Sequence, residues 1–331
     1  MSFISVLFAL LIEQARPLGR GNPVHASLRA WVRWSTRNFD AGKSFHGWLA
    51  WAFAVGGPSL ATLVIYWVLD AFLGWPVAVM WSVAVLYATL GFRQFSFHFT
   101  QIRDALSDGD EDRARDLLAQ WQQIDASELP RSEIVRHVIE YSVLAAHRHV
   151  FGVLAWFTVL AAFGFGPAGA VLYRLSEFVA RYWQHKSKTH NQPVSEALQQ
   201  TAANAWAAID WLPARITAIS FAVVGSFEEA IDGWRYYEPR FEGDNDGIIL
   251  AATSGAVNVR LGGVASVATM PADGAPAMPP VPPGIVDRRR ASASGQTPEL
   301  AHLAVIVGLV WRTVVMWMVL LALLTLARLL G

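Results

Sequence analysis

Apolar and polar stretches alternate along this chain on the length scale of whole helices. The clearest apolar segments are 47–73, 76–92 and 300–327. Because a hydrocarbon core of about 30 Å takes roughly 20 helical residues, we predict that these three cross a membrane. A tight turn between the first two makes them a hairpin. Three weaker apolar segments allow a span, a re-entrant hairpin or a buried helix; they are 150–170, 213–226 and 248–270.

The N-terminal segment, residues 1–46, is rich in arginine. Its first apolar run, Phe3–Ile12, is too short to span a membrane, so we predict an interfacial or re-entrant helix. Ala26–Trp34 places Arg29 and Arg33 on one helix face and apolar side chains on the other. Such a basic amphipathic helix suits an anionic membrane surface. Because positive flanking residues favour the cytoplasm, we expect both ends of the hairpin on that side.

A polar arm, residues 93–149, separates two apolar regions and carries much of the charge. The spacing of its apolar residues predicts helices over Phe99–Leu106, Asp110–Gln123 and Leu129–Ala146. The acidic residues around Gly109 suit a turn and the start of the second helix. We therefore expect a soluble helical excursion between membrane segments.

Further helices are predicted beyond the arm. One begins after the helix-breaking sequence GFGP and includes Tyr173 and Arg174. Another, Val194–Trp211, should end at Pro213, because proline lacks the N–H that a helix interior uses. Residues 271–298 are rich in proline, alanine and serine, and we expect them to be disordered.

Together these patterns predict an all-α, polytopic integral membrane protein with a helical polar domain on the membrane face. We expect an interfacial N-terminal segment, a transmembrane hairpin, the polar arm, mixed helices forming the candidate site, a linker and a C-terminal span. Their bounds are 1–46, 47–92, 93–149, 150–270, 271–298 and 299–331. The pattern does not fix the oligomeric state.

Composition agrees with a membrane protein and excludes several functions. Of 331 residues, 54% are hydrophobic and 16% are charged, against about 25% charged in soluble domains. Fifteen tryptophans suit the membrane interface, so membrane lipids are expected partners. A formal net charge of zero gives no reason to expect nucleic acid as a partner. The absence of cysteine excludes disulfides, thiol catalysis and cysteine-ligated metals.

Arg260 is the strongest single candidate for a functional residue. It lies in the middle of the apolar stretch 248–270, where a charge is costly unless it is paired or faces a polar cavity. Arg312, inside the C-terminal span, either snorkels toward an interface or pairs with a carboxylate. His147 and His149 stand two residues apart and so lie on different helix faces, which favours interface histidines over a metal site.

Four motifs stand in order between residues 90 and 263. The polar arm reads RDALSDGDEDRARDLLAQWQQIDASELPRSEIVRHVIE, and GPAGAVLYR, DWLPARIT and SGAVNVRLGG follow it. Their composition and order resemble the CobD/CbiB family of membrane proteins of cobalamin biosynthesis. Each motif is weak alone, but four in the same order are specific for the superfamily.

The resemblance implies an inner-membrane enzyme that forms an amide, joining an aminopropanol arm to adenosylcobyric acid with ATP and Mg²⁺. A corrinoid would be its substrate. The chemistry needs carboxylates for the metal and arginines for phosphate; Asp110, Glu140 and Asp210 are assigned as catalytic residues, and no residue is assigned as a dedicated metal ligand. The candidate carboxylates are Asp108, Asp110, Glu140 and Asp210. The candidate phosphate-binding arginines are Arg103, Arg115, Arg174, Arg215 and Arg260.

The chain departs from the family pattern at the end of the arm. Where the family has Glu-Asn and Asp-Gly, this chain has Leu144 and Ala145, then Arg148 and His149, which removes carboxylates. This altered helix and the opening MSFISVLFALLIEQARPLG resemble the AmpE branch of the same superfamily. The alternative function is therefore a non-catalytic inner-membrane protein of envelope and β-lactamase regulatory signalling.

Each candidate residue also has a structural interpretation. Asp110 suits a helix cap, and Arg103 and Arg115 suit solvated helix faces. Asp210 and Arg215, on either side of a proline, suit a structural ion pair. Carboxylates gathered round one cavity would favour the enzyme, whereas scattered carboxylates would favour a binding or sensor role.

Overall fold

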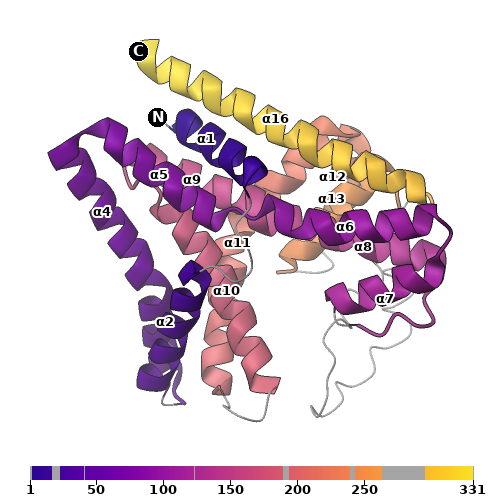
Figure 1. Cartoon of the computed structure of the whole chain (residues 1–331), viewed down its shortest axis with the longest axis horizontal. Coiled ribbons are helices and arrows are strands. Elements are labelled where there is room, and N and C mark those ends of the chain that lie inside the picture. Colours follow the sequence, from indigo (N-terminus) through magenta and orange to yellow (C-terminus); the bar gives the residue numbers. More distant parts are fainter. Residues whose placement is uncertain are drawn as a thin grey trace. The chain divides into compact units, whose positions relative to one another are not determined.

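The computed structural model describes residues 2–16, 23–40, 42–122, 124–188, 194–238, 243–262 and 295–330. Within these residues every regular element is a helix (Figure 1). An isolated bridge between Val259 and Gln296 joins two segments without forming a sheet. The prediction of an all-α protein is confirmed.

The chain divides into two compact units, and each unit is built from separate stretches of sequence. Unit 1 comprises Met1–Arg93, Arg148–Pro213 and Met318–Gly331. Unit 2 comprises Gln94–His147 and Ala214–Trp317. Their boundaries cut across the consecutive segments expected from the sequence, because tertiary packing groups helices that are distant in the chain.

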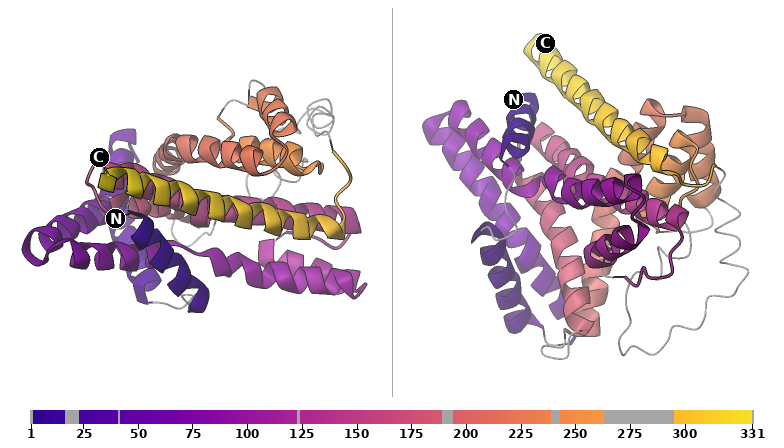
Figure 2. Two further views of the ribbon diagram at one scale, coloured as in Figure 1. Left: turned by 90° about the horizontal axis from the view of Figure 1, so that it is seen from above. Right: turned by 45° about the vertical axis from the view of Figure 1, so that its right-hand side comes forward.

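Unit 1 contains the N-terminal helices and the middle of the chain. Its helices are α1 (Ser2–Ala15), α2 (Pro23–Phe39), α3 (Ser44–Trp51), the π-helical turn η1 (Ala52–Gly56), α4 (Gly57–Leu73), α5 (Trp75–Thr89), α9 (Gly152–Ala162) and α10 (Ala168–Lys188). Gly74, with a φ of 82°, reverses the chain so that α4 and α5 pack against each other (Figure 2). α10 packs on α9, α4 and η1, and α1 packs on α5.

The predicted basic amphipathic helix is α2, and its apolar side packs inward. Val32 is fully buried, and the Ser35 hydroxyl donates to the carbonyl of Ala50 at 2.8 Å. Thr36 Oγ1 accepts from the indole N–H of Trp183 on α10 at 2.8 Å. The exposed side of α2 carries three arginines, namely Arg29, Arg33 and Arg37.

Unit 2 combines the polar arm with later helices. It contains most of α6 (Phe92–Ser107) together with α7 (Glu111–Gln122), α8 (Arg131–Ala146), α12 (Phe227–Tyr237) and α13 (Asn245–Val257). α7 and α13 pack on α8, and α12 packs on α13. The three helices predicted in the polar arm are therefore present, as α6, α7 and α8.

Two glycines allow the backbones of α12 and α13 to pack in direct contact. A Cβ atom at Gly255 would lie 2.1 Å from the carbonyl oxygen of Glu229. One at Gly233 would lie 2.7 Å from the carbonyl oxygen of Ala251. Any larger residue at either position would force the two helices apart, so the close packing depends on glycine.

Two helices, α11 (Glu196–Val224) and α16 (Leu300–Leu330), contribute residues to both units. A π-helical turn, η2 (His147–Phe151), continues α8 into α9. By length and composition, four helical stretches of the described residues could cross a membrane: Ser44–Leu73, Arg131–Ala162, Glu196–Val224 and Leu300–Ala327. The polytopic membrane class is confirmed, and the first and last stretches correspond to predicted spans.

The second half of the predicted hairpin is shorter than expected. α5 ends at Thr89 after 15 residues. At 1.5 Å per residue this helix is about 22 Å long, short of a core of about 30 Å. It stops because Leu90 adopts an extended backbone conformation, with φ −72° and ψ 152°. α5 is therefore shorter than the predicted segment 76–92, and that this segment crosses a membrane stays a prediction.

Pro213 lies inside α11 and does not end it. Proline has no N–H to donate to the carbonyl of Ile209, four residues earlier. The indole N–H of Trp156 on α9 donates to that carbonyl at 2.9 Å, so this half-buried acceptor still has a donor. The weak apolar segment at 213–226 is thus the second half of one long helix.

The apolar stretch 248–270 is not one helix in its described part. α13 ends at Val257 because Asn258 takes a left-handed conformation, with a φ of 54°. Arg260 lies beyond this end of the helix and has an exposed side chain. Most of the predicted disordered linker, 271–298, lies outside the described residues, although Gln296 within it pairs with Val259.

Candidate functional site

A buried group of charged side chains lies on α8 in unit 2. Arg136 is 6% exposed and Glu140 is 5% exposed. Arg136 Nη1 donates to Glu140 Oε1 at 3.1 Å, and Arg136 Nε donates to Glu133 Oε2 at 3.0 Å. The three residues share one helix face because they are spaced three and four residues apart. Burial of a charged pair is tolerated only when both partners are well bonded, and here they are.

Glu140 also links α8 to the last of the four motifs. The backbone N–H of Gly262 donates to Glu140 Oε1 at 2.8 Å. The chain reaches this position through a fixed turn, since Ser254 donates its hydroxyl to the carbonyl of Val259 at 2.7 Å. The N–H of Arg260 donates to the carbonyl of Gln296 at 2.9 Å. The polar arm and the SGAVNVRLGG motif therefore meet at Glu140.

The end of the third motif, DWLPARIT, also forms hydrogen bonds with other elements of unit 2. Arg215 Nη2 donates to Glu238 Oε1 at 2.5 Å, and Arg215 Nη1 donates to Asn245 Oδ1 at 3.3 Å. Thr217 Oγ1 lies 2.9 Å from Nδ1 of the fully buried His147. Unit 2 thus joins the arm, the end of DWLPARIT and the final motif in one body.

A second polar group lies in unit 1, where the GPAGAVLYR motif meets the start of DWLPARIT. The Tyr173 hydroxyl donates to Asp210 Oδ1 at 2.8 Å, and both residues are buried. Gly152 on α9 lies directly against this tyrosine ring. Arg174 Nη1 donates to Glu177 Oε2 at 2.6 Å, and Arg181 pairs with the same carboxylate. One buried carboxylate therefore serves two arginines.

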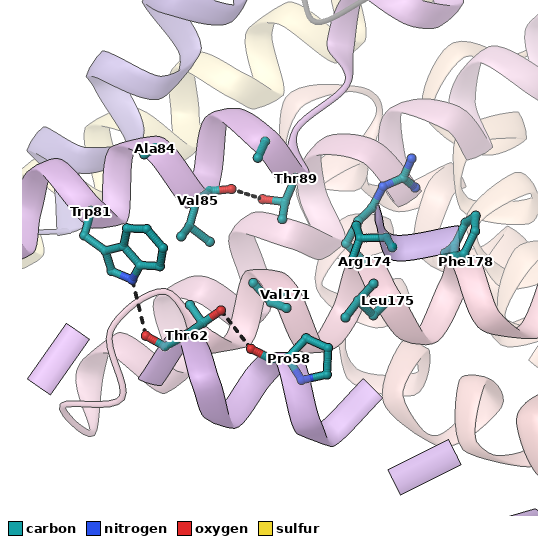
Figure 3. Close-up of a pocket in the computed structure, with 12 residues that line it drawn as sticks. Pro58, Thr62, Trp81, Ala84, Val85, Thr89, Val171, Arg174, Leu175 and Phe178 are labelled. Carbon is teal, nitrogen blue, oxygen red and sulfur yellow. Dashed lines mark hydrogen bonds between the residues drawn. The ribbon is translucent and has the colours of Figure 1, made fainter. Parts of the chain in front are cut away.

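Arg174 is also the charged residue in the lining of an apolar cavity in unit 1. The cavity has a volume of about 350 Å³ and is formed by α2, α4, α5 and α10. Figure 3 shows Arg174 beside Leu175 and Phe178 of α10, with Trp81 on the opposite side of the group. A cavity of this size falls in the usual range of ligand pockets.

The other predicted residues have local partners on the surface of unit 2. Asp110 Oδ1 accepts from the N–H of Arg113 at 3.0 Å, which caps the start of α7. Arg103 pairs with the neighbouring Asp104 at 2.8 Å. Arg115 pairs with Glu111 and Asp112 and donates to the carbonyl of Leu129. Asp108 is exposed in the preceding turn.

The predicted residues therefore do not form one group. Unit 2 brings Glu140, Arg215 and Arg260 into the same body, and unit 1 contains Arg174 and Asp210. Sequence reasoning missed Arg136, Glu177 and Gly262. The first two carry a signal, because opposite charges recur three or four residues apart on one predicted helix. Gly262 has no local signal, since its partner lies 122 residues away.

The described residues do not fit a resident magnesium ion. In the ranges that the structure describes, no three His, Asp or Glu side chains are placed to hold a metal. Both buried candidate carboxylates already accept from protein donors: Glu140 from Arg136 and Gly262, and Asp210 from Tyr173. Because Mg²⁺ in nucleotide sites is held by carboxylates plus phosphate oxygens, ATP and Mg²⁺ stay predictions from the resemblance.

Comparison with known proteins identifies relatives over nearly the whole chain. It is 29% identical over 328 residues to the "Cobalamin biosynthesis protein CobD" of Stutzerimonas stutzeri, covering 96% of each chain. It is 33% identical over 181 residues to the protein of the same name from Chromobacterium violaceum, covering 55% of each chain. A third protein of that name, from Leptospira interrogans, is 30% identical over 203 residues, or 58% of this chain and 59% of its own.

No solved structure matches the chain. The AmpE-like alternative finds no support in these comparisons. The family model described as "CobD/Cbib protein" matches residues 3–282. This match covers all four motifs, from the polar arm to the turn at Gly262, and so the chain belongs to the CobD/CbiB family.

Proposed function

We propose that this chain acts in cobalamin biosynthesis as an amide-forming protein of the bacterial inner membrane. The observation that carries the proposal is the match along 96% of the chain to a protein named for cobalamin biosynthesis. The four apolar helical stretches support a membrane location. The substrate would be a corrinoid carboxylic acid, to which an amine-bearing aminopropanol arm is joined.

Unit 2 supplies the residues that best suit this function. Forming an amide from a carboxylate and an amine releases water, and a phosphorylated substrate or co-substrate would bring negative charge to the site. Arg260 has an exposed guanidinium on a backbone that is hydrogen-bonded to Gln296, which supports a role in binding such a phosphate. Glu140 is a positioning residue for the segment that carries Arg260, because it accepts a hydrogen bond from the backbone N–H of Gly262.

In unit 1, we propose the Tyr173–Asp210 pair and Arg174 as site residues. A buried tyrosine hydroxyl bonded to a carboxylate is a polar pair that packing holds in place. By the resemblance, ATP would drive the formation of the amide. The described residues do not assign a step of the reaction to ATP. Asp110, Arg103 and Arg115 have local structural partners, so a chemical role for them rests on the resemblance alone.

Complementation tests the proposal directly. A strain lacking its cobinamide-phosphate synthase would express this chain under cobalamin-dependent growth with adenosylcobyric acid supplied. We expect growth, which would mean that the substitutions at Leu144, Ala145 and Arg148 leave the activity intact. Failure to grow, with the protein shown to be in the membrane, would contradict the proposal and return weight to a non-catalytic role.

A matched pair of variants tests the site. Arg260→Ala should abolish complementation without changing the amount of protein in the membrane, because it removes the proposed phosphate contact. Arg235→Ala is the control, since Arg235 is an exposed arginine on α12 of the same unit. Growth of the Arg260→Ala strain at the wild-type rate would remove Arg260 from the site.

A further inference from the structure

The cavity in unit 1 presents almost no hydrogen-bonding groups to its interior. The Thr62 hydroxyl donates to the carbonyl of Pro58 at 2.9 Å, and the Thr89 hydroxyl donates to that of Val85 at 2.9 Å. The Trp81 indole N–H donates to the carbonyl of Thr62 at 3.3 Å. Figure 3 shows these three bonds directed at the backbone. The polar side chains of α4 and α5 therefore expose carbon atoms to the cavity, and an alkyl chain fits its chemistry.

Positive charge borders this apolar space. Arg174 lines the cavity, and it shares the carboxylate of Glu177 with Arg181. Leu28 of α2 also lines the cavity. α2 contains no acidic residue, and its arginines at positions 29, 33 and 37 recur every four residues on the exposed side.

Aromatic residues indicate that α2 lies at the depth of lipid headgroups. Trp31 and Trp34 stack with ring centroids 5.1 Å apart and are 36% and 47% exposed. Exposed tryptophans are typical of the membrane–water interface, where a ring meets both the acyl chains and the headgroups. A basic amphipathic helix at that depth attracts anionic lipids.

We propose that the cavity holds an acyl chain of an anionic glycerophospholipid, with the lipid phosphate beside Arg174 and the arginine face of α2. The apolar walls select the chain, and the arginines select the charge of the headgroup. The site does not depend on the amide chemistry proposed for unit 2, and it gives Arg174, which is also a proposed site residue of unit 1, a lipid phosphate as its ligand.

The charge part of the proposal is tested by lipid titration of the full chain in a neutral detergent. Native mass spectrometry would count bound dioleoyl-phosphatidylglycerol and, in parallel, zwitterionic dioleoyl-phosphatidylcholine. We expect one tightly held phosphatidylglycerol per chain and weaker binding of phosphatidylcholine. The triple variant R29Q/R33Q/R37Q should bind phosphatidylglycerol about 100-fold more weakly, because each lost arginine contributes about 1 kcal/mol near an anionic lipid and about 1.4 kcal/mol is a factor of ten. Equal binding of the two lipids by the wild-type chain would overturn the assignment.

The cavity part is tested by filling the space. Ala84 lines the cavity with an exposed side chain, so Ala84→Phe should fill part of it and lower phosphatidylglycerol binding at least several-fold. Ala71→Phe, at an exposed position of α4 outside the lining, is the matched control and should bind as the wild type does. If Ala84→Phe does not fold, as judged by circular dichroism, Ala88→Phe fills the same wall. Wild-type binding by a folded cavity-filling variant would refute the cavity as the site.

Discussion

Gly152→Ala should disrupt the polar group of unit 1 by adding a single methyl group. A Cβ atom at Gly152 would lie 2.1 Å from Cζ and 2.2 Å from the hydroxyl oxygen of Tyr173. No real Cβ tolerates such distances, and the tyrosine is fully buried, so its ring must move. Movement of the ring breaks the 2.8 Å hydrogen bond from Tyr173 to Asp210.

The expected loss of free energy of unfolding has two contributions. Overpacking of a close-packed interior costs about 1–3 kcal/mol. A hydrogen bond to a charged group contributes roughly 1.5–3 kcal/mol. Gly152→Ala should therefore reduce the free energy of unfolding by about 2.5–6 kcal/mol, with the upper end reached only if the two effects are independent.

The assay is thermal unfolding of the purified protein in one detergent, followed by tryptophan fluorescence. Gly56→Ala is the control, because Gly56 is also helical, lies in the same unit, and has open space where its Cβ would be. That change should be neutral or stabilise by about 0.4–1 kcal/mol, since alanine restricts the unfolded chain. Equal unfolding midpoints for the two variants would refute the reasoning from the Tyr173 contact.

Four further predictions concern single residues. Glu140→Gln should lower the free energy of unfolding by about 1.5–3 kcal/mol, measured in the same assay, because it weakens the charged hydrogen bond from Arg136; an unchanged midpoint would contradict this. Asp110→Ala should lower the free energy of unfolding by about 1 kcal/mol, whereas Asp110→Asn keeps the helix cap. Loss of complementation by the asparagine variant would therefore reveal a chemical role of the carboxylate. Trp156→Phe should cost about 1 kcal/mol by removing the donor to the half-buried carbonyl of Ile209, and a wild-type midpoint would contradict this. Ser107→Cys, in a chain with no other cysteine, should resist impermeant thiol reagents added outside the cell; labelling from outside would contradict the cytoplasmic position of the arm.

The sequence predicted the helices well where periodicity alone decides them. α2 and α7 appear close to their expected positions because each has one clear apolar face, whereas α8 was found from the helical spacing of its apolar residues although it is buried on most sides. Prediction failed at Pro213, where the missing donor is replaced by Trp156, 57 positions earlier in the chain. No local rule anticipates a partner at that separation.

The candidate site was predictable in its motifs but not in their pairing. That the arm must meet the last motif follows from the resemblance, but the meeting point, Glu140 with Gly262, is a long-range hydrogen bond. Arg260 was singled out because an apolar run surrounds it in sequence. The left-handed turn at Asn258 ends the helix first, and so hydropathy overestimated the burial of this arginine.

The glycine contact between α12 and α13 has a consequence for how the protein can be handled. Most helix pairs in water associate because apolar side chains avoid the solvent, and detergent tails weaken that preference. Backbones at the distances found at Gly233 and Gly255 are held by dispersion between atoms already in contact, which works equally in lipid, detergent or water. We therefore expect this helix pair to survive extraction into short-chain detergents that loosen the rest of the molecule, and a two-helix fragment built on it is the natural core for stabilised variants.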